Sequence, residues 1–484
     1  MPPNLVWFRQ DLRLEDNEAL LAAVECGAPV IPVFINTLAH DGQWAPGAAS
    51  RWWLHHSLAA LDKRLRQRGS RLVLRRGPAA DTLIRLVRET GASAVIVNRH
   101  IEPDDAQTDA ELATRLQRLG TQWLSFQSNL LFDPDAVRTR QGRAFTVFTP
   151  FWRACLSQDE PPAPRPAPAR IPKPRQWPTS LPLNELEPLP EIDWAGGLRT
   201  AWTPGEAGAQ RLLTEFADRR WRSYDRDRER PDLPGTSRLS PHLHWGEIGP
   251  RQIWHALHAR AARSRAADAR DNAAAYLRQL GWREFAHGLL HHFPQTTDKP
   301  MREAFARFPW RKDTAALRTW QQGQTGYPLV DAGMRELWRT GWMHNRVRMI
   351  AASFLTKHLL IPWQQGAAWF WDTLVDADLA NNTLGWQWVA GCGADAAPYF
   401  RIFNPASQGE TNDPNGNYVR RWVPELAELP AKWIHRPWKA DAATLAAAGV
   451  KLGHTYPRPI VDHALARERA LAAYQTIRKR NAPS

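Results

Sequence analysis

Two acidic side chains and two adjacent asparagines lie close together in the segment Asp376–Trp388, which also carries two tryptophans. Paired carboxylates such as Asp376 and Asp378 could act in general acid–base catalysis or bind a metal ion. Because no His or Cys cluster accompanies them, the sequence predicts no metal site. Ion pairs with Arg346 and Arg348, from a nearby helical segment, are the default structural interpretation of these carboxylates.

A second candidate is the loop Gly235–Ser240, which is rich in small hydroxyl residues and is followed by Pro241. Its backbone N–H groups, its hydroxyl groups and the guanidinium of Arg238 could surround a phosphate. An ordinary capped loop before a helix that starts at Gly246 explains the same residues. The residue types alone leave both interpretations open.

Two predicted helical segments carry Trp, Arg, Asn and Met side chains at spacings that place them on one face. Gln279, Trp282 and Arg283 form the first group, and Asn345 and Met349 lie one turn apart in the second. An electropositive, aromatic face suits the binding of a nucleobase. A core helix with a partly exposed arginine is the alternative.

Short apolar runs alternate with amphipathic stretches over residues 1–130, which predicts a doubly wound parallel α/β domain. The expected strands are Leu5–Phe8, Val30–Ile35, Leu72–Leu74, Ala94–Val97 and Leu124–Phe126. The stretch Arg51–Leu65 has leucines at helical spacing. A Gly-x-Gly-x-x-Gly turn is missing, so the sequence does not favour a dinucleotide site of the Rossmann type in this domain.

Residues 131–204 are expected to connect this domain to the remainder of the chain. Their proline-rich stretch, 161–174, has no helical or strand periodicity and should run extended over the surface. A proline-rich recognition motif is the alternative. From residue 205 to 484 the patterns are helical, which predicts an all-α domain that contains most of the tryptophans.

The composition is basic and rich in tryptophan, with 63 Lys and Arg against 49 Asp and Glu, a net charge of +14 and 25 Trp. This balance predicts affinity for a polyanion without distinguishing DNA, RNA or a phosphorylated cofactor. The apolar content excludes a disordered chain, and no apolar run is long enough to predict a membrane span. Three widely separated cysteines and an N-terminus without a signal-like segment favour a cytoplasmic protein without disulfides.

Six separate motifs together resemble those of the DNA photolyase/cryptochrome family, and they occur in family order over nearly the whole chain. They are Trp7–Arg13, Gly235–Ser240, Trp282–Phe285, Thr325–Pro328, Gly341–Arg346 and Asp395–Pro405, the last followed by Gln408 and Gly409. The nearest likeness is to bacterial class I cyclobutane pyrimidine dimer photolyases. The resemblance implies an α/β antenna-chromophore domain joined by the long connector to a helical domain that binds FAD and DNA.

The resemblance also implies roles for individual residues around FAD. Asn382 would face the flavin N5, and Arg348 would pair with Asp376. Trp386, Trp363 and Trp310 match the family's chain of three tryptophans, which passes an electron to the flavin after light absorption; core packing is the alternative for them. The expected FAD-binding residues are Tyr224, Thr236, Ser237, Arg238, Leu239, Ser240, Tyr276, Arg283, Arg348, Asp376, Ala377, Asp378 and Asn382.

For the substrate, the resemblance implies UV-damaged DNA whose pyrimidine dimer is flipped out of the duplex, as the photolyases do. Trp282 and Trp388 would flank the dimer, and reduced, excited FAD would donate the electron that splits it. The expected DNA contacts are Arg228, Gln279, Trp282, Asn345, Arg346, Met349, Trp388 and Arg401. The expected activity is light-dependent DNA repair by a monomeric lyase without a membrane partner.

Two positions depart from the pattern of dimer photolyases. Gln279 stands where that class carries Glu, and a Gln cannot donate or accept a proton through a change of charge, so repair could be slower or specificity altered. Tyr276 replaces a Trp. Gln279 keeps a cryptochrome-type blue-light photoreceptor open as the alternative function. Asn345 counts against the six-four branch, which carries His there.

The antenna chromophore is left undecided between methenyltetrahydrofolate and a deazaflavin. The stretch Asn98–Asp105 aligns with the folate-contacting region of relatives, with Asp105 where Glu is usual.

Overall fold

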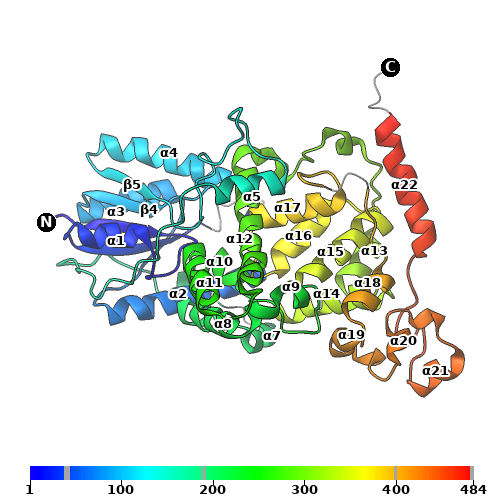
Figure 1. Cartoon of the computed structure of the whole chain (residues 1–484). Coiled ribbons are helices and arrows are strands. Elements are labelled where there is room, and N and C mark those ends of the chain that lie inside the picture. The colour runs from blue at the N-terminus through cyan, green and yellow to red at the C-terminus, as the bar shows by residue number, and fades with distance from the viewer. Residues whose placement is uncertain (38–43, 187–188, 190–191, 397–399, 480–484) are drawn as a thin grey trace. The chain divides into compact units, whose positions relative to one another are not determined.

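The computed structural model describes residues 1–37, 44–186, 189, 192–396 and 400–479 (Figure 1). The chain forms two compact units. The first unit comprises Met1–Arg222, Ser237–Pro294 and Val375–Ala380, and the second comprises Ser223–Thr236, Gln295–Leu374 and Asn381–Ser484. The domain boundaries expected from the sequence stay a prediction.

A five-stranded parallel sheet forms the centre of the N-terminal half of the first unit. Its strands are β1 (Asn4–Phe8), β2 (Val30–Asn36), β3 (Val73–Arg76), β4 (Ala94–Asn98) and β5 (Gln122–Phe126). They follow the order β3-β2-β1-β4-β5, so the chain reverses its direction of winding at β1. The expected doubly wound α/β fold and its five strands are confirmed.

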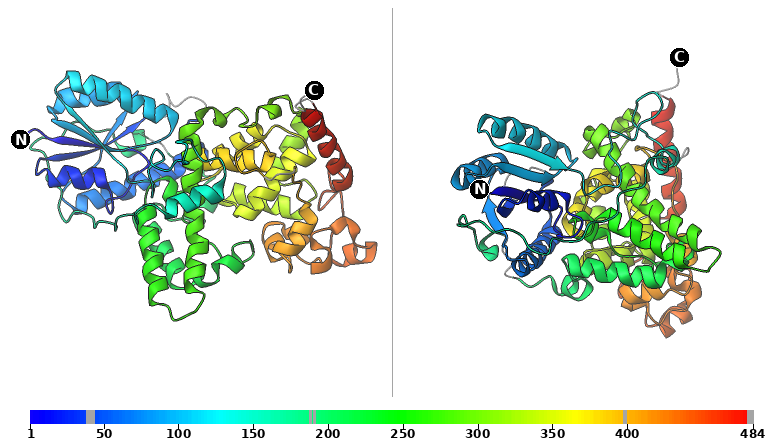
Figure 2. Two further views of the ribbon diagram at one scale, coloured as in Figure 1. Left: turned by 45° about the horizontal axis from the view of Figure 1, so that its top comes forward. Right: turned by 60° about the vertical axis from the view of Figure 1, so that its left-hand side comes forward.

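Helices lie on both sides of this sheet (Figure 2). They are α1 (Glu18–Glu25), α2 (Ala48–Gln67), α3 (Ala79–Thr90) and α4 (Pro103–Arg118). Helices α3 and α4 pack against each other and on β2 and β5, while α1 packs on β1, β4 and β5. The sheet core is aliphatic, with Leu5, Ile31 and Val95 fully buried. Burial of apolar surface of this kind is the main stabilising contribution to the unit.

A buried arginine ties the end of the first motif to distant parts of the first unit. Arg13 is fully buried, and its guanidinium donates to the carbonyls of Ser128 at 2.9 Å and Gly246 at 3.0 Å. Arg251 lies beside it and pairs with Asp16 at 2.7 Å. Because a buried charge is costly unless its hydrogen bonds are satisfied, these partners are required for the sheet region to be stable.

The proline-rich connector is extended, as expected, but it is fastened to the first unit along its length. The backbone N–H of Val30 donates to the Pro172 carbonyl at 2.7 Å, and that of Leu181 donates to Leu74 at 3.0 Å. His255 contacts the Pro161 carbonyl at 2.7 Å. The connector is therefore part of the packed structure rather than a free tether.

The first unit contains further helices, of which α10 and α12 contribute residues to the candidate site. They are α5 (Phe148–Leu156), α6 (Leu183–Leu186), α7 (Gly196–Ala201), α8 (Glu206–Asp218), α10 (Ser240–His244), α11 (Pro250–Arg263) and α12 (Ala269–His292). The helix expected to start at Gly246 begins at Pro250 instead, as α11, and the short α10 precedes it. Gly246 forms a turn with φ +62°, and a Cβ there would lie 2.1 Å from the Gln10 carbonyl oxygen, so no other residue fits.

The described part of the second unit is helical, as the sequence predicts. Its main helices are α9 (Tyr224–Asp227), α13 (Thr314–Gln321), α14 (Pro328–Thr340), α15 (Asn345–Ser353), α16 (Trp363–Thr373), α17 (Leu379–Ala390), α18 (Pro405–Asn412), α19 (Asn417–Trp422), α20 (Ala431–Ile434), α21 (Ala442–Ala447) and α22 (His463–Lys479). Helix α17 starts in the first unit. The predicted helical segment that carries Asn345 and Met349 is α15, which continues into a π-helical turn, η6 (Phe354–His358), whose hydrogen bonds run one residue further back. Among the described residues, no helix is long and apolar enough to cross a membrane.

Because two histidines are buried, we predict that acid lowers the free energy of unfolding of the protein. Burial lowers the pKa of His358 to about 3 and that of His344 to about 4. The unfolded chain therefore binds protons first as the pH falls below 6.5, and stability decreases from that pH toward the folded pKa values. At pH 5 each histidine should cost about 2 kcal/mol, from about 1.4 kcal/mol per pH unit.

The measurement is the thermal unfolding midpoint at pH 7.5 and pH 5 for the wild type and for His358→Phe. The His358 ring stacks on Phe354 with 4.9 Å between centroids, so a phenyl ring keeps this contact without the titration. The variant should lose less stability on acidification. An identical pH dependence in both proteins would refute the assignment.

Candidate functional site

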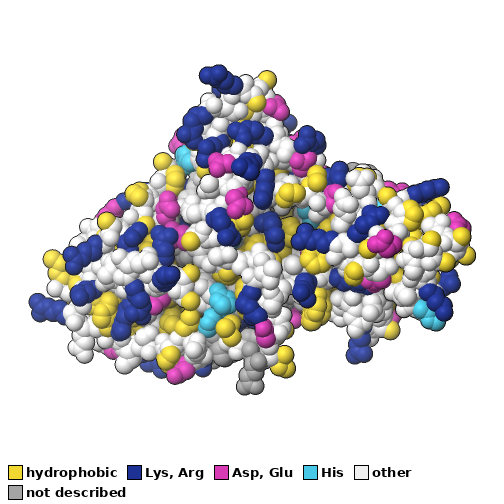
Figure 3. Space-filling model, turned by 90° about the horizontal axis from the view of Figure 1, so that it is seen from below, with side chains coloured by type: hydrophobic (Ala, Val, Ile, Leu, Met, Phe, Trp, Pro, Cys, Tyr) yellow, Lys and Arg dark blue, Asp and Glu magenta, His cyan; other side chains and the backbone are white. Residues whose placement is uncertain are grey.

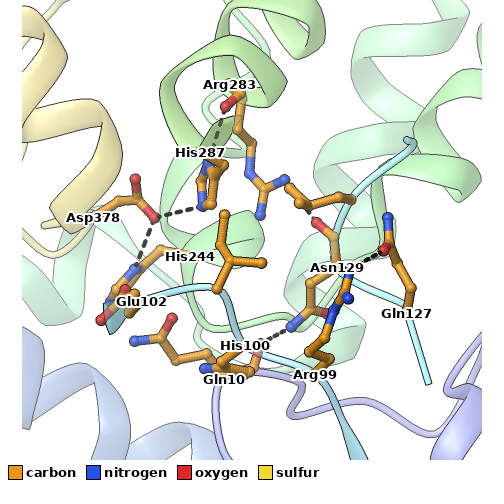
Figure 4. Close-up of a pocket in the computed structure, with 12 residues that line it drawn as sticks. Gln10, Arg99, His100, Glu102, Gln127, Asn129, His244, Arg283, His287 and Asp378 are labelled. Carbon is orange, nitrogen blue, oxygen red and sulfur yellow. Dashed lines mark hydrogen bonds and ion pairs between the residues drawn. The ribbon is translucent and has the colours of Figure 1, made fainter. Parts of the chain in front are cut away.

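Two histidines from distant parts of the chain lie beside one buried carboxylate in the first unit. Asp378, at the start of α17, points toward His287 of α12 and His244 of α10 (Figure 4), with nitrogen–oxygen distances of 3.4 and 3.8 Å. Burial alone would raise the pKa of Asp378, but the two histidines outweigh it and hold that pKa well below its usual range. The site therefore holds an ionised, buried carboxylate, which suits contact with hydrogen-bond donors of a ligand.

A pocket opens beside this cluster. It contains a second acid, Glu102, whose pKa is shifted in the opposite direction from that of Asp378. Burial raises the pKa of Glu102 well above its ordinary value, and the nearby Asp105 and Asp378 add to the rise. A raised pKa makes this carboxyl group easier to protonate, and in its protonated form it can donate a hydrogen bond. The pocket is lined by Gln10, Arg99, His100, Ile101, Glu102, Gln127, Asn129, Leu130, His244, Arg283, His287 and Asp378.

The loop that follows β5 is held against α12 at one wall of the pocket. Arg283 donates to the Asn129 carbonyl at 2.7 Å. The next residue, Glu284, is buried and accepts from the backbone N–H groups of Leu131 and Phe132 at 2.8 and 3.2 Å. The expected FAD contact Arg283 thus has a structural role in the first unit as well.

The hydroxyl-rich loop forms a tight turn that supports the phosphate interpretation. Tyr276 donates its hydroxyl to Ser237 at 2.8 Å, and burial raises the pKa of Tyr276 to about 12, so it stays a donor. Arg238 adopts φ 56° and places its guanidinium over the Trp202 ring at 4.2 Å. At Gly235, a Cβ would lie 2.6 Å from the Asp227 carbonyl oxygen. These hydroxyl groups and this cation are the donors that phosphates require. Leu239 is buried, and Ser240 is exposed at the start of α10.

Other residues expected at FAD are distributed over the two units. Asp376 and Ala377 lie with Asp378 in the first unit and are buried. In the second unit, Asn382 donates its side-chain amide to the Ala367 carbonyl at 3.1 Å. Arg348 donates to the Met343 carbonyl at 2.7 Å, and Tyr224 is buried while Thr236 is partly exposed. The expected roles of these residues stay predictions.

The three tryptophans of the expected electron-transfer chain differ in exposure within the second unit. Trp386 and Trp363 are each 2% exposed, whereas Trp310 is partly exposed. Trp386 is tightly enclosed: Phe370 lies 5.0 Å away between ring centroids, and a Cβ at Gly366 would lie 2.1 Å from the Trp386 ring. The change from buried to exposed is the order that an outward electron path needs.

The two tryptophans expected to flank a lesion are both partly buried, each in its own unit. Trp282 stacks on Phe148 with 3.8 Å between centroids, so one face of its ring is covered. Trp388 donates its indole N–H to the Asp395 carbonyl at 3.1 Å. Each ring is thus held in a fixed orientation by a protein partner.

Several expected DNA contacts carry positive charge in the second unit. Arg346 and Arg228 both contact Glu229, and Arg401 is exposed with its guanidinium 5.2 Å from the Phe403 ring. Asn345 and Met349 lie one turn apart on α15, with 3.9 Å between Nδ2 and Sδ, as their spacing predicts. More generally, Lys and Arg side chains are spread over the face seen in Figure 3.

Comparison with known proteins agrees with this geometry. The chain is 50% identical to a deoxyribodipyrimidine photo-lyase of Agrobacterium fabrum over 478 residues, 99% of this chain and 98% of the relative. The chain belongs to the DNA photolyase/cryptochrome family. Models of this family match twice: the DNA photolyase model at residues 4–169, and the FAD binding domain of DNA photolyase at residues 276–476.

Two further relatives show how the family's branches compare with this chain. Cryptochrome-2 of Arabidopsis thaliana is 40% identical over 98% of this chain and 79% of the relative. The crystal structure of a bacterial class III photolyase from Agrobacterium tumefaciens superimposes with a TM-score of 0.95 at 50% identity, covering 99% and 98% of the two chains. The motifs resemble those of class I dimer photolyases, whereas this similar structure is that of a class III photolyase.

Some residues of this photolyase-family site are not evident from the sequence. His244, His287 and Glu229 have no special spacing, although His287 follows Arg283 by one helical turn. One three-residue group in the described part of the chain, Asp135, His291 and His292, could hold a metal ion. Its carboxylate already pairs with Arg138 at 2.8 Å, and its side chains are partly exposed, so the structure gives no positive sign of a metal there.

Proposed function

We propose that this chain is a light-dependent DNA repair lyase, a deoxyribodipyrimidine photo-lyase that splits cyclobutane pyrimidine dimers in UV-damaged DNA. The observation that carries the proposal is the 50% identity to a photo-lyase over nearly the full length of both chains. The site residues support it, because the chain offers a hydroxyl-rich turn, an ionised buried carboxylate and enclosed tryptophans. When bound and reduced, FAD would supply the light-excited electron that splits the dimer.

The protein's own share of this reaction is to bind, orient and exclude water. Ser237, Arg238 and Tyr276 would hold the phosphates of FAD, and Asp376, Asp378 and Asn382 would contact its flavin and ribose. Trp386, Trp363 and Trp310 would carry electrons inward. A preorganised, desolvated site makes each of these polar contacts stronger than it would be in water.

On the substrate side, Trp282 and Trp388 would stack against the flipped dimer, with Asn345 and Met349 near it. Such base stacking is worth about 1–3 kcal/mol per base in single-strand binding proteins. Arg228, Arg346 and Arg401 would contact phosphates. Because phosphate contacts release counterions, binding of damaged DNA should weaken steeply as salt increases.

The function is tested by blue-light repair of an oligonucleotide that contains one thymine dimer, with the flavin chemically reduced beforehand. We expect loss of the dimer in the light and none in a dark control. Equal dimer content in light and dark would refute the proposal. It would favour the second candidate, a cryptochrome-type photoreceptor, for which the 40% identity to Cryptochrome-2 and the Gln279 substitution speak.

Gln279→Glu should raise the repair yield per absorbed photon. Gln279 is partly buried in α12, and its side-chain nitrogen has no hydrogen-bond partner among the described residues, which suits a ligand contact. A carboxyl group can pass a proton to the dimer, whereas the amide can only hydrogen-bond. The measurement is repair yield at matched absorbance. A yield that is equal or lower would show that the amide is no handicap in this site.

The pocket beside Glu102 is our candidate for the antenna chromophore, either a folate or a deazaflavin, and its lining shares Arg283 and Asp378 with the residues expected at FAD. The carboxyl group of Glu102, whose pKa burial raises, and the amides of Gln127 and Asn129 offer donors and acceptors for a heterocycle. The absorption spectrum of the purified protein, after the flavin bands are subtracted, tests whether a second chromophore is bound, and Glu102→Ala should reduce its content. The expected cytoplasmic location and monomeric state stay predictions.

A further inference from the structure

Glu229 occupies an unusual position between two arginines in the second unit. Its Oε2 accepts from Nε of Arg346 at 2.5 Å and also pairs with that residue's terminal nitrogen. Its Oε1 accepts from Nε of Arg228 at 3.1 Å. One carboxylate thus uses its two oxygens to hold two guanidinium groups that come from positions 117 residues and one residue away.

The charges in this cluster are partly shielded from water, so the pairing is effective. The side chains of Arg346, Arg228 and Glu229 are 22%, 29% and 35% exposed. Burial would raise the pKa of Glu229, but Arg346 and then Arg228 outweigh it and lower that pKa, so the carboxylate is ionised at neutral pH. The backbone of Arg346 is also held in place, because its N–H donates to Nδ1 of His344 at 3.2 Å.

The pairing has a consequence for DNA binding. A guanidinium that already holds a carboxylate must share or give up that partner before it can hold a phosphate, and phosphate contacts alone carry no information about damage. Specificity is a difference between two affinities, so a device that weakens contact with ordinary duplex DNA raises it. A flipped lesion would also stack on Trp282 and Trp388, and these contacts would offset the cost of separating the arginines from Glu229.

We propose that Glu229 is a positioning residue that determines specificity: it restrains Arg228 and Arg346 so that they engage the backbone beside a lesion but bind undamaged duplex poorly. The inference rests on the proposed DNA-repair function and deepens it. The neighbouring arginines provide an internal comparison, since Arg226 and Arg230 each pair with an acid of the same segment, Asp227 and Asp232. Glu229 is the acid of this segment that also reaches a second helix, α15.

The test compares wild type, Glu229→Gln and Asp227→Asn, the last as a control that removes one negative charge from the same segment. Dissociation constants are measured in the dark for matched duplexes with and without one thymine dimer, over a range of salt concentrations. Glu229→Gln should tighten binding of undamaged duplex by about threefold or more and increase its salt slope by about one, the change expected for one more engaged cation. Binding of the dimer duplex should change less, so the ratio of the two constants falls.

A second variant separates this role from a structural one. In an Arg346→Gln background, Glu229→Gln should change the undamaged-duplex affinity by a smaller factor, because only Arg228 is then left for Glu229 to restrain. Equal factors on both duplexes, or an equal loss of discrimination in Asp227→Asn, would overturn the inference. A Glu229→Gln effect that is equally large without Arg346 would also overturn it. If wild type itself showed no preference for the dimer, the proposed function would fail first, and this inference with it.

Discussion

Replacing Trp386 by Phe should slow light-driven reduction of the bound flavin by at least about tenfold. Phe is much harder to oxidise than Trp, and a barrier higher by only about 1.4 kcal/mol already lowers a rate tenfold. The ring is 2% exposed and packs against Phe370 at 5.0 Å, so a phenyl group fills most of the same space. Photoreduction is measured as the decay of oxidised-flavin absorbance under blue light with an external thiol donor.

The matched control is Trp388→Ala, two residues along the same helix. That variant should keep the photoreduction rate but weaken binding of dimer-containing DNA by roughly tenfold, from the loss of about 1–3 kcal/mol of stacking. Trp386→Phe should show the reverse, with slowed photoreduction and unchanged DNA affinity in the dark. An unaltered photoreduction rate in Trp386→Phe would mean that electrons reach the flavin by another route.

Gly366→Ala should displace the ring of Trp386 while leaving the tryptophan itself in the sequence. A Cβ at Gly366 would lie 2.1 Å from Cη2 of Trp386 and 2.7 Å from a methyl group of Leu355, far inside van der Waals contact. Inserting a methyl group into a filled core typically costs about 1–3 kcal/mol. We expect a lower thermal unfolding midpoint, and altered Trp fluorescence because the ring of Trp386 must move.

The control for this prediction is Gly385→Ala, which adds the same methyl group immediately before Trp386. At Gly385 no atom lies within 4 Å of the added Cβ, and the residue is helical. Ala is favoured over Gly inside a helix by roughly 0.5–1 kcal/mol, so this variant should be slightly more stable than wild type. If both variants had equal stability, the enclosure of Trp386 described above would be wrong.

The sheet could be predicted from the sequence because parallel strands are buried on both faces. Strands β1, β2 and β4 are buried at every position, and each reads as an apolar run with one Asn at an end. The long helices can be predicted from a different signal, apolar residues at helical spacing. The π-turn at Phe354–His358 could not be, since a hydrogen-bond shift of one residue leaves no mark on side-chain periodicity.

The site was predictable only where residues are neighbours in sequence. Asn345 and Met349 share a helical face, and their contact follows from spacing alone. The convergence of Asp378 with His244 and His287 depends on the tertiary fold, as does the pairing of Glu229 with Arg346 across 117 positions. For the tryptophans, family resemblance and not composition singled out individual residues.

The hydrogen bonds of Arg13 have a consequence for synthesis on the ribosome. All five strands are complete by Phe126, but the guanidinium of Arg13 needs the Gly246 carbonyl, and Asp16 beside it pairs with Arg251. Until those residues emerge, Arg13 has the Ser128 carbonyl but lacks that of Gly246, and Asp16 lacks Arg251, which disfavours the compact form of the nascent sheet. The N-terminal half of this protein therefore cannot finish folding when its own strands are made, and a chain released before residue 251 should remain a target for chaperones and proteases.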